Sequence, residues 1–336
     1  MRITFCGLAA LLLCVTACAT SSARAEPDIN REALWVFIEE VADKHDFNQE
    51  ALARLFGQIE PRPRVIEAIS SPAEAKPWYV YRPLFVNKGR IRGGVRFWGS
   101  HKETLARAET VYGVPQEIIV AIIGVETRYG KTTGVHPVLA SLTTLAFAYP
   151  PRSRFFRREL EEYLLLTREE GLNPLFIKGS YAGAMGPGQF IASSYRRFAV
   201  DFDGDGRRDL LHNITDVIGS VANYLQVHGW KPKQAVASRA RTRGERYKSF
   251  LNQDLKPRIS LRRMERYGVI PEDNLPRGHL ATLIALETVT GREYWIGLHN
   301  FYVITRYNRS ALYAMAIHQL SQKILAERTL IKTSAE

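Results

Sequence analysis

An apolar stretch that ends in a carboxylate constrains this chain most. Residues 115 to 130 read PQEIIVAIIGVETRYG, and their apolar side chains recur at helical spacing. Pro115 suits the first position of a helix and Gly130 suits its end, so we expect a buried helix between them. Glu126 then lies in the last turn, where apolar surroundings and the negative end of the helix dipole both favour its protonated form. A general acid requires that form.

The first residues have the form of an export signal. Arg2 gives a basic start, and residues 3 to 17 form an apolar run that is too short to span a bilayer comfortably. Two cleavage sites compete. Residues 15 to 18 (VTAC) have the shape of a lipoprotein box, whereas residues 23 to 25 (ARA) have the small-x-small form that signal peptidase accepts.

We favour cleavage before Cys18, which would then carry the lipid. Cys6 and Cys14 lie inside the leader, so the mature chain keeps one cysteine, its anchor, and forms no internal disulfide. Ala19 follows Cys18 where an aspartate could stand, which in a Gram-negative bacterium resembles an outer-membrane address. We therefore expect a periplasmic protein anchored to the outer membrane. An uncleaved anchor helix and a plain secreted protein stay open as alternatives.

The rest of the chain has the composition of a soluble globular protein. No later apolar run approaches membrane length, and the 319 residues that remain when residues 1–17 are subtracted from 336 fit about two domains. The formal charge of +12, outside the cytoplasm, points to anionic envelope polymers more than to nucleic acid. The alternative is a basic surface that serves solubility alone.

Hydrophobic spacing predicts a mainly helical chain with one β-rich segment. Helices are expected within residues 31–70, 101–112, 155–170, 216–227 and 309–323, and irregular structure around 78–82. Strand-like runs occupy 258–261, 279–289 and 293–298, with a turn at Thr290-Gly291. The organisation that we infer is a signal peptide (1–17), a tether (18–30), an α and catalytic core (31–235), a small β-rich domain (236–300) and a C-terminal helix that completes the core (301–325).

Residues 201 to 209 (DFDGDGRRD) resemble an EF-hand calcium loop. Aspartates occupy positions 1, 3, 5 and 9, a glycine occupies position 6, and Arg207 stands at position 7. His212 replaces the glutamate of position 12, and Asp216 is the expected substitute. We therefore predict a structural Ca²⁺ held within loop 201–216 by Asp201, Asp203, Asp205, Arg207, Asp209 and Asp216.

The same residues have a simpler interpretation. Aspartates and glycines also form turns, and Asp216 could serve as the N-cap of the helix that follows. We favour the metal, because four aspartates so close together repel each other unless a cation neutralises them.

Four motifs occur in an order that is similar to the membrane-bound lytic murein transglycosylase B family. They are the Glu126 helix, residues 178 to 190 (KGSYAGAMGPGQF), the aspartate loop and residues 307 to 310 (YNRS). The resemblance runs from about Trp35 to Leu320. It implies a lysozyme-like α-helical core with an EF-hand-type loop, an α domain and a small β domain, and cleavage of the glycan strands of peptidoglycan.

The resemblance also implies roles for individual residues. Glu126 matches the single catalytic acid/base. The sugar cleft is matched by Ser180, Gln189, Tyr224, Tyr307, Asn308 and Tyr313. The chain departs from the family at Tyr129, where tryptophan is frequent, at Ala192, where proline is common, and in an aspartate loop one residue longer.

One acid can cleave a glycosidic bond if the substrate supplies the nucleophile. Most glycosidases use two carboxylates, and the sequence offers one convincing candidate. Glu126 would protonate the glycosidic oxygen between MurNAc and GlcNAc, and the 6-hydroxyl of the muramoyl sugar would close a 1,6-anhydro ring as Glu126 takes its proton. The enzyme would serve wall remodelling and turnover. No organic cofactor is expected, and we expect a monomer that binds peptidoglycan and no nucleic acid.

Other interpretations stay open. Glu126 could be a helix-end carboxylate paired with Arg128, and Tyr224 and Tyr313 could be ordinary core residues. At the level of function, the alternatives are a hydrolytic lysozyme and a non-catalytic wall-binding lipoprotein.

Overall fold

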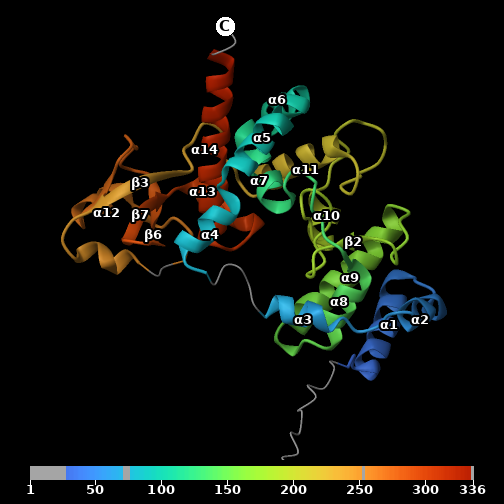
Figure 1. The fold of residues 1–336 in the computed structure, drawn as a ribbon. Helices are drawn as coiled ribbons and strands as arrows, with labels where there is room; N and C mark the ends of the chain where they lie inside the picture. The colour runs from blue at the N-terminus through green and yellow to red at the C-terminus, as the bar shows by residue number, and fades with distance from the viewer. Residues whose placement is uncertain (1–27, 71–75, 252–253, 334–336) are drawn as a thin grey trace, which may run out of the picture.

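Helices form the body of the protein, for which a computed structural model describes residues 28–70, 76–251 and 254–333. Figure 1 shows α1 to α3 grouped with α8 and α9 at one end, and α5 to α7 beside α11 in the middle. These helices are α1 (Arg31–His45), α2 (Gln49–Gly57), α3 (Pro63–Ile69), α4 (Trp78–Phe85), α5 (Lys88–Ser100), α6 (Lys102–Tyr112), α7 (Gln116–Thr127), α8 (Val138–Phe147), η2 (Pro150–Arg152), α9 (Ser153–Glu169), α10 (Ala192–Phe198) and α11 (Ile214–Val227).

A five-stranded antiparallel sheet follows, in the order β4-β6-β7-β3-β5. The hairpin of β6 and β7 pairs Thr288 with Gly291 at its turn and Thr282 with Gly297 at its far end. The elements of this part are β3 (Ala237–Thr242), η3 (Arg246–Phe250), β4 (Ile259–Ser260), α12 (Leu261–Arg266), β5 (Val269–Pro271), β6 (Leu280–Thr288) and β7 (Gly291–Gly297). The sheet, η3 and α12 bury a separate apolar cluster centred on Met264 and Ile296.

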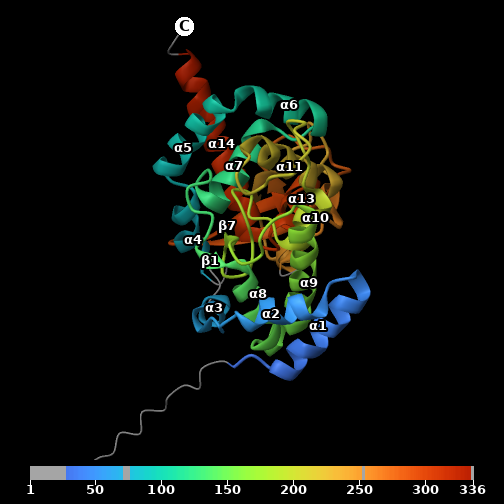
Figure 2. The same ribbon diagram turned by 90° about the vertical axis from the view of Figure 1, so that its right-hand side faces the viewer.

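The chain then returns to the helical body through α13 (His299–Tyr307) and α14 (Ala311–Thr333). α14 packs against α7, α5 and α4, and its last turns project beyond the other elements in both views (Figures 1 and 2). A two-stranded ladder of β1 (His136–Pro137) and β2 (Lys178–Gly179) ties the chain after α7 to the loop before α10. The end of α7 is therefore surrounded by segments far apart in sequence.

No single helix in the described ranges is both long and apolar enough to cross a bilayer. α6 and α7 reach the required length and composition only as a pair, and they meet at 114°.

Most of the expected helices are confirmed, with shifted ends. α7 begins at Gln116 with Pro115 as its N-cap, and it ends at Thr127 rather than near Gly130. The helix expected at 309–323 is longer, and α13 precedes it.

The expectation of irregular structure around residues 78 to 82 is wrong. This segment is α4, and α5 follows it, although α4 contains Pro83 and α5 contains several glycines. Tertiary contacts override the local preference. In the β-rich part, β3 and β5 had no clear signal, and Leu261 begins a helix instead of ending a strand. The division of the chain into domains stays a prediction.

Candidate active site

Glu126 interrupts the buried C-terminal part of α7. Every residue from Ile118 to Val125 is buried, Thr127 is buried, and Glu126 between them is partly exposed. Arg128 closes the helix in a left-handed conformation (φ 52°) and donates its backbone N–H to the carbonyl of Gly124. The helix thus ends directly after a carboxylate that can reach a ligand.

Two buried tyrosines from the end of the chain face this carboxylate. Tyr313 donates its hydroxyl to Oε1 of Glu126 at 2.6 Å, and Tyr307 donates to the carbonyl of Gly188 at 2.5 Å. Burial raises the pKa of both tyrosines well above the ordinary value, and the charge of Glu126 raises it further. Both phenols therefore stay protonated, and Tyr313 can act as a permanent hydrogen-bond donor to Glu126.

The loop from 180 to 190 is held against the end of α7. Thr127 donates its hydroxyl to the carbonyl of Pro187 at 2.7 Å, and Met185 and Phe190 exchange backbone hydrogen bonds. Ser180 accepts the N–H of Ala184 at 3.0 Å. The hydroxyl of Ser180 thus maintains the shape of the loop, and its contact with substrate stays a prediction.

Gln189 also fixes this loop. Its backbone is left-handed (φ 51°), which is uncommon for a residue with a side chain. Its side-chain N–H₂ donates to the carbonyls of Thr133 and Gly186, both at 3.0 Å. These bonds set the direction of the amide, so a sugar would meet a fixed group.

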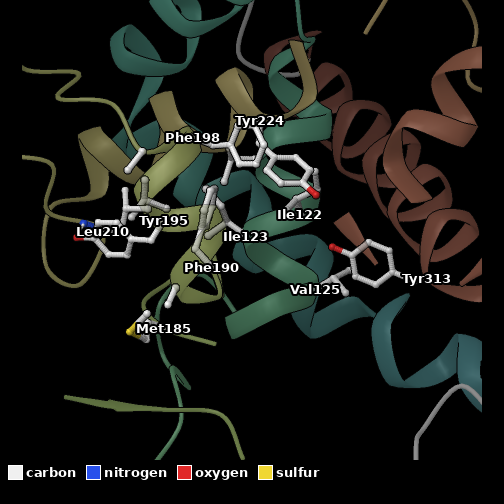
Figure 3. Close-up of a cluster of buried hydrophobic side chains, with 14 of the residues drawn as sticks. Ile122, Ile123, Val125, Met185, Phe190, Tyr195, Phe198, Leu210, Tyr224 and Tyr313 are labelled. Carbon is white, nitrogen blue, oxygen red and sulfur yellow. Dashed lines mark hydrogen bonds between the residues drawn. The ribbon is translucent and has the colours of Figure 1, made fainter. Parts of the chain in front are cut away.

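Tyr224 is a packed aromatic residue at the edge of a cavity. Its ring stacks on His228 at 4.1 Å and lies 4.8 Å from the rings of Phe198 and Tyr307. Its hydroxyl donates to the carbonyl of Arg306 at 2.6 Å, and burial raises its pKa to about 12. Figure 3 shows Tyr224 with Phe190 and Phe198 on one side of α7, and Tyr313 beside Val125 on the other. The expected cleft residues therefore lie on two sides of the end of α7.

The cavity beside Tyr224 has a volume of about 640 Å³, and Gln189 and Tyr307 also line it. Asn308 follows Tyr307 as the C-cap of α13, with extended backbone. The structure thus brings Gln189, Tyr224 and Tyr307 to one hollow, while Tyr313 contacts Glu126 directly.

Two residues that hold the end of α7 in place were not indicated by any sequence pattern. Arg90 of α5 donates to the carbonyls of Gly124 and Val125, which lie in the last turn of the helix. Burial is the main cause that lowers the pKa of Arg90, while the charge of Glu126 acts in the opposite direction. Because α5 was not expected as a helix, no pattern could place Arg90 beside Glu126.

Tyr129 is the second of these residues. Its hydroxyl donates to the carbonyl of Arg90 at 2.6 Å, and its ring fits against three glycines. A Cβ at Gly93 or Gly94 would lie 2.7 Å from Tyr129, and one at Gly124 would lie 2.6 Å from it. The glycines leave room for an aromatic ring under the last turn of α7.

The aspartate loop gathers carboxylates in the manner of a cation site. Ligand oxygens of Asp201, Asp203 and Asp216 lie within 4.8 Å of one another. Asp216 is fully buried, and it accepts the N–H groups of Phe202 at 2.7 Å and Asp209 at 2.8 Å. Burial raises the pKa of Asp216, and the charges of Asp203 and Asp201 raise it too. These donors fit a divalent cation, which would relieve that repulsion.

Other members of the loop have separate tasks. Asp201 accepts the N–H of Gly206 at 2.8 Å, and such bonds lower its pKa against the opposing effect of desolvation. Asp209 accepts the N–H groups of Leu211 and His212, both at 2.9 Å, so it caps the following turn. Asn213 is the N-cap of α11, so the alternative role of Asp216 as N-cap is wrong. Asp205 and Arg207 remain exposed in the loop, and Cys18 lies outside the described residues.

A helical body, one carboxylate facing buried tyrosines and an aspartate loop before α11 together define a class of glycan-cleaving enzyme. Residues 30–322 match the family described as "Transglycosylase SLT domain", and the chain belongs to this family. It is a lytic transglycosylase that cleaves peptidoglycan.

Particular relatives agree with this assignment. The chain is 42% identical over 302 residues, 87% of its own length and 82% of the relative's, to membrane-bound lytic murein transglycosylase B of Escherichia coli (strain K12). It is similar to the crystal structure of soluble lytic transglycosylase SltB1 from Pseudomonas aeruginosa, with a TM-score of 0.84 and 47% identity over 88% of this chain and 99% of that one. It is also similar to the Escherichia coli lytic transglycosylase SLT35 in complex with calcium, with a TM-score of 0.81 and 42% identity over 88% and 93% of the two chains.

These findings confirm three predictions: the family, the mainly α fold with a small β part, and the lytic transglycosylase activity. The roles of individual site residues stay predictions.

Proposed function

We propose that Glu126 is the single acid/base of the reaction. The observation that carries this proposal is its position: a partly exposed carboxylate at the end of a buried helix, with a permanent hydroxyl donor at 2.6 Å. The side chains that act on Glu126 in the described structure include Tyr313, Tyr307 and Arg90, and none of these three is a carboxylate. We therefore assign the second catalytic group to the substrate and not to a second carboxylate.

The substrate supplies the second catalytic group. Glu126 donates a proton to the glycosidic oxygen between MurNAc and GlcNAc as the C1–O bond breaks, and the N-acetyl carbonyl of the muramoyl sugar stabilises the positive centre at C1. The 6-hydroxyl of the same sugar then attacks C1 and gives its proton to Glu126. The product carries a 1,6-anhydro ring, and the acid is regenerated without water. Tyr313 holds the carboxylate in place through both proton transfers.

The remaining cleft residues bind and orient the sugars. Tyr224 and Tyr307 offer aromatic surface at the cavity, while the fixed amide of Gln189 suits an acetamido group. Ser180 and Asn308 lie on the segments that frame this cavity, at the start of the 180–190 loop and at the end of α13.

The aspartate loop would hold a structural Ca²⁺ through Asp201, Asp203 and Asp216, with Asp205 and the backbone carbonyl of Arg207 completing the loop positions. The cation would neutralise buried negative charge and fix the start of α11, which carries Tyr224. A lipid on Cys18 would tether the enzyme to the outer membrane, with its catalytic body in the periplasm.

Product analysis tests the proposal. Mature protein is incubated with purified sacculi, and the soluble muropeptides are analysed by mass spectrometry, with Glu126→Gln as control. We expect 1,6-anhydro-muramoyl ends, about 18 Da lighter than hydrolysed ends, and no release by the control. Reducing ends would indicate a lysozyme-type hydrolase, and release by the control would remove Glu126 from the mechanism.

A further inference from the structure

A second cavity, of about 660 Å³, lies where the sheet joins the helical body. It is bounded by the segment between α11 and β3, by the segments before β4 and before β6, and by the start of α13, which directly follows β7 (Figure 1). Among the described residues that line it, none is an aspartate or a glutamate. Its basic residues are Lys231, Lys233, Lys256, His279 and His299. We call it the lysine cavity.

A buried amide holds one lysine-bearing segment against α13. The side-chain oxygen of Asn300, which is fully buried, accepts the backbone N–H of Lys231 at 2.9 Å. The N–H₂ group of Asn300 donates to the carbonyls of Lys231 at 2.8 Å and Gln234 at 2.9 Å. These bonds go to the backbone of the segment. The side chains of Lys231 and Lys233 are therefore presented to the cavity from a fixed loop.

The start of α13 contributes to the same cavity. Leu298 and His299, the N-cap and the first residue of this nine-residue helix, line it, and no side chain in the described structure caps the first N–H groups. Nε2 of His299 donates to the carbonyl of Gly229 at 2.7 Å, which fixes the direction of the imidazole ring. The unpaired N–H groups and the dipole of a helix start favour negative charge, so this wall adds to the effect of the lysines.

The cations of the lysine cavity have no carboxylate partner in the ranges that the structure describes. None of its lysines or histidines lies within 4.0 Å of a carboxylate oxygen. Asp254 accepts the backbone N–H of Lys256 at 3.1 Å, but its carboxylate pairs with Arg258 at 2.8 Å. Residues 231 to 300 carry fourteen lysines and arginines and seven aspartates and glutamates, so the surroundings are basic too.

Phosphate suits these groups better than carboxylate does. The ammonium group of lysine acts as a compact point charge and is a common phosphate binder, whereas the planar guanidinium of arginine matches a carboxylate through two parallel hydrogen bonds. The described lining of this cavity contains lysine and histidine but no arginine. The start of a helix is also a frequent phosphate site. The chemistry of the wall therefore selects one class of anion.

We propose that the lysine cavity binds a phosphate group, carried by an anionic phospholipid headgroup or by a soluble phosphate. The cavity shares no lining residue with the cavity beside Tyr224, so this is a second binding site. The inference does not depend on the role of Glu126. The proposed tether at Cys18 would bring lipid phosphates within reach, because a membrane surface with anionic headgroups attracts lysine side chains.

Two probes test the proposal and separate the two sources of phosphate. The mature chain with Cys18→Ser, which cannot carry a lipid, is titrated in a calorimeter with inorganic phosphate and with acetate at the same ionic strength. Its binding to vesicles of phosphatidylcholine, alone or mixed with phosphatidylglycerol, is measured by sedimentation. We expect phosphate to bind at least about tenfold more tightly than acetate, because it carries more charge and more acceptor oxygens.

A charge-matched pair of variants locates the binding. Lys231→Gln/Lys233→Gln should lower the affinity for phosphate at least about tenfold, because two ammonium groups are lost while the backbone bonds to Asn300 are kept. Lys88→Gln/Lys102→Gln is the control. It removes the same charge from two exposed lysines at the starts of α5 and α6, and neither lines the cavity. The control should bind phosphate as the wild type does, and thermal melting verifies that both variants fold.

The possible outcomes are distinct. Binding to the phosphatidylglycerol vesicles that only the Lys231/Lys233 variant loses assigns the site to a lipid headgroup, whereas binding of inorganic phosphate without vesicle binding assigns it to a soluble phosphate. Equal losses in the two double variants would reflect net charge alone and would overturn the proposal. Equal affinity for phosphate and acetate, or no binding of either phosphate probe, would overturn it as well. None of these measurements involves glycan cleavage, so their failure leaves the proposed function unaffected.

Discussion

Glu126 and Asp216 are both carboxylates on helices, and their surroundings differ in every respect that matters for acidity. Glu126 is at the C-terminal end of α7, partly exposed, beside one hydroxyl donor. Asp216 is in the first turn of α11, fully buried, with two backbone donors and two neighbouring aspartates. The helix dipole opposes a negative charge on Glu126, at the C-terminal end of its helix, and favours one on Asp216, near the N-terminal end.

The comparison shows how one side-chain type serves two kinds of chemistry. A carboxylate at the exposed end of a buried helix, held by a hydroxyl donor, is placed to give and take a proton. Clustered carboxylates gain most by sharing a divalent cation. Position on the helix and the number of acidic neighbours decide between these uses.

The largest expected effect is at Glu126. Glu126→Gln should lower kcat/KM by at least about 10³-fold, because the general acid is lost while the shape of the side chain is kept. Glu117→Gln is the control: Glu117 is on the same helix at its opposite end, and burial raises the pKa of Glu117. Release of muropeptides is the measurement, and similar activity in both variants would contradict the distinction between the two ends of α7.

Asp216→Ala should have the largest effect on stability. The change leaves the N–H groups of Phe202 and Asp209 without their acceptor and removes a metal ligand, so the free energy of unfolding should fall by about 3 kcal/mol. Asp209→Ala, which removes the cap of a turn and lies outside the group of three close carboxylates, should cost about 1 kcal/mol. Urea denaturation in the presence of Ca²⁺ compares the two variants. Equal losses in the free energy of unfolding would contradict a larger contribution of Asp216.

Removal of the cation should reduce stability by a similar or smaller amount. A chelator should lower the free energy of unfolding of the wild type by about 2.7 kcal/mol if Ca²⁺ was present at a hundred times its Kd. The same chelator should leave Asp216→Ala unchanged. A wild type whose melting does not respond to the chelator, and which binds no Ca²⁺ in calorimetry, would show that the loop is a turn without metal.

Tyr313→Phe should have the smallest effect of this series, about a tenfold loss in kcat. The variant removes the hydroxyl donor to Glu126. Since the pKa of Tyr313 is raised well above its ordinary value, the wild-type activity should show no loss from its ionisation between about pH 6 and 9. Tyr163→Phe is matched for burial, since Tyr163 donates to the carbonyl of Pro174 at 2.8 Å. That control should lose stability without losing kcat.

Local patterns predicted the Glu126 helix and the aspartate loop well, since both are continuous in sequence. Hydrophobic spacing indicated α7, and the alternation of aspartates and glycines indicated the loop. The contact between Glu126 and Tyr313 joins residues far apart in the chain, and only the family resemblance suggested it.

α4 and α5 show why the rest could not be predicted. Pro83 and the glycines of α5 are poor helix formers, so local preference argues against both helices. Gly93 and Gly94 are required by the ring of Tyr129 from another part of the chain. The need for glycine at positions 93 and 94 can be recognised only in the folded structure, where α5 packs against Tyr129.

The ring of Tyr129 under the last turn of α7 restricts the substitutions that neighbouring positions can accept during evolution. Positions 93, 94, 124 and 129 share one volume, because a Cβ at any of the three glycines would come within 2.7 Å of the Tyr129 side chain. In related chains these positions should change together: a lineage with a smaller residue at 129 can accept alanine at 93 or 124, whereas one with an equally large or larger ring must keep all three glycines. Alanine at 94 also requires a smaller residue at 324, because its Cβ would lie 2.5 Å from Ile324. Glu126 can then stay unchanged while the residues packed beneath the last turn of α7 are substituted together.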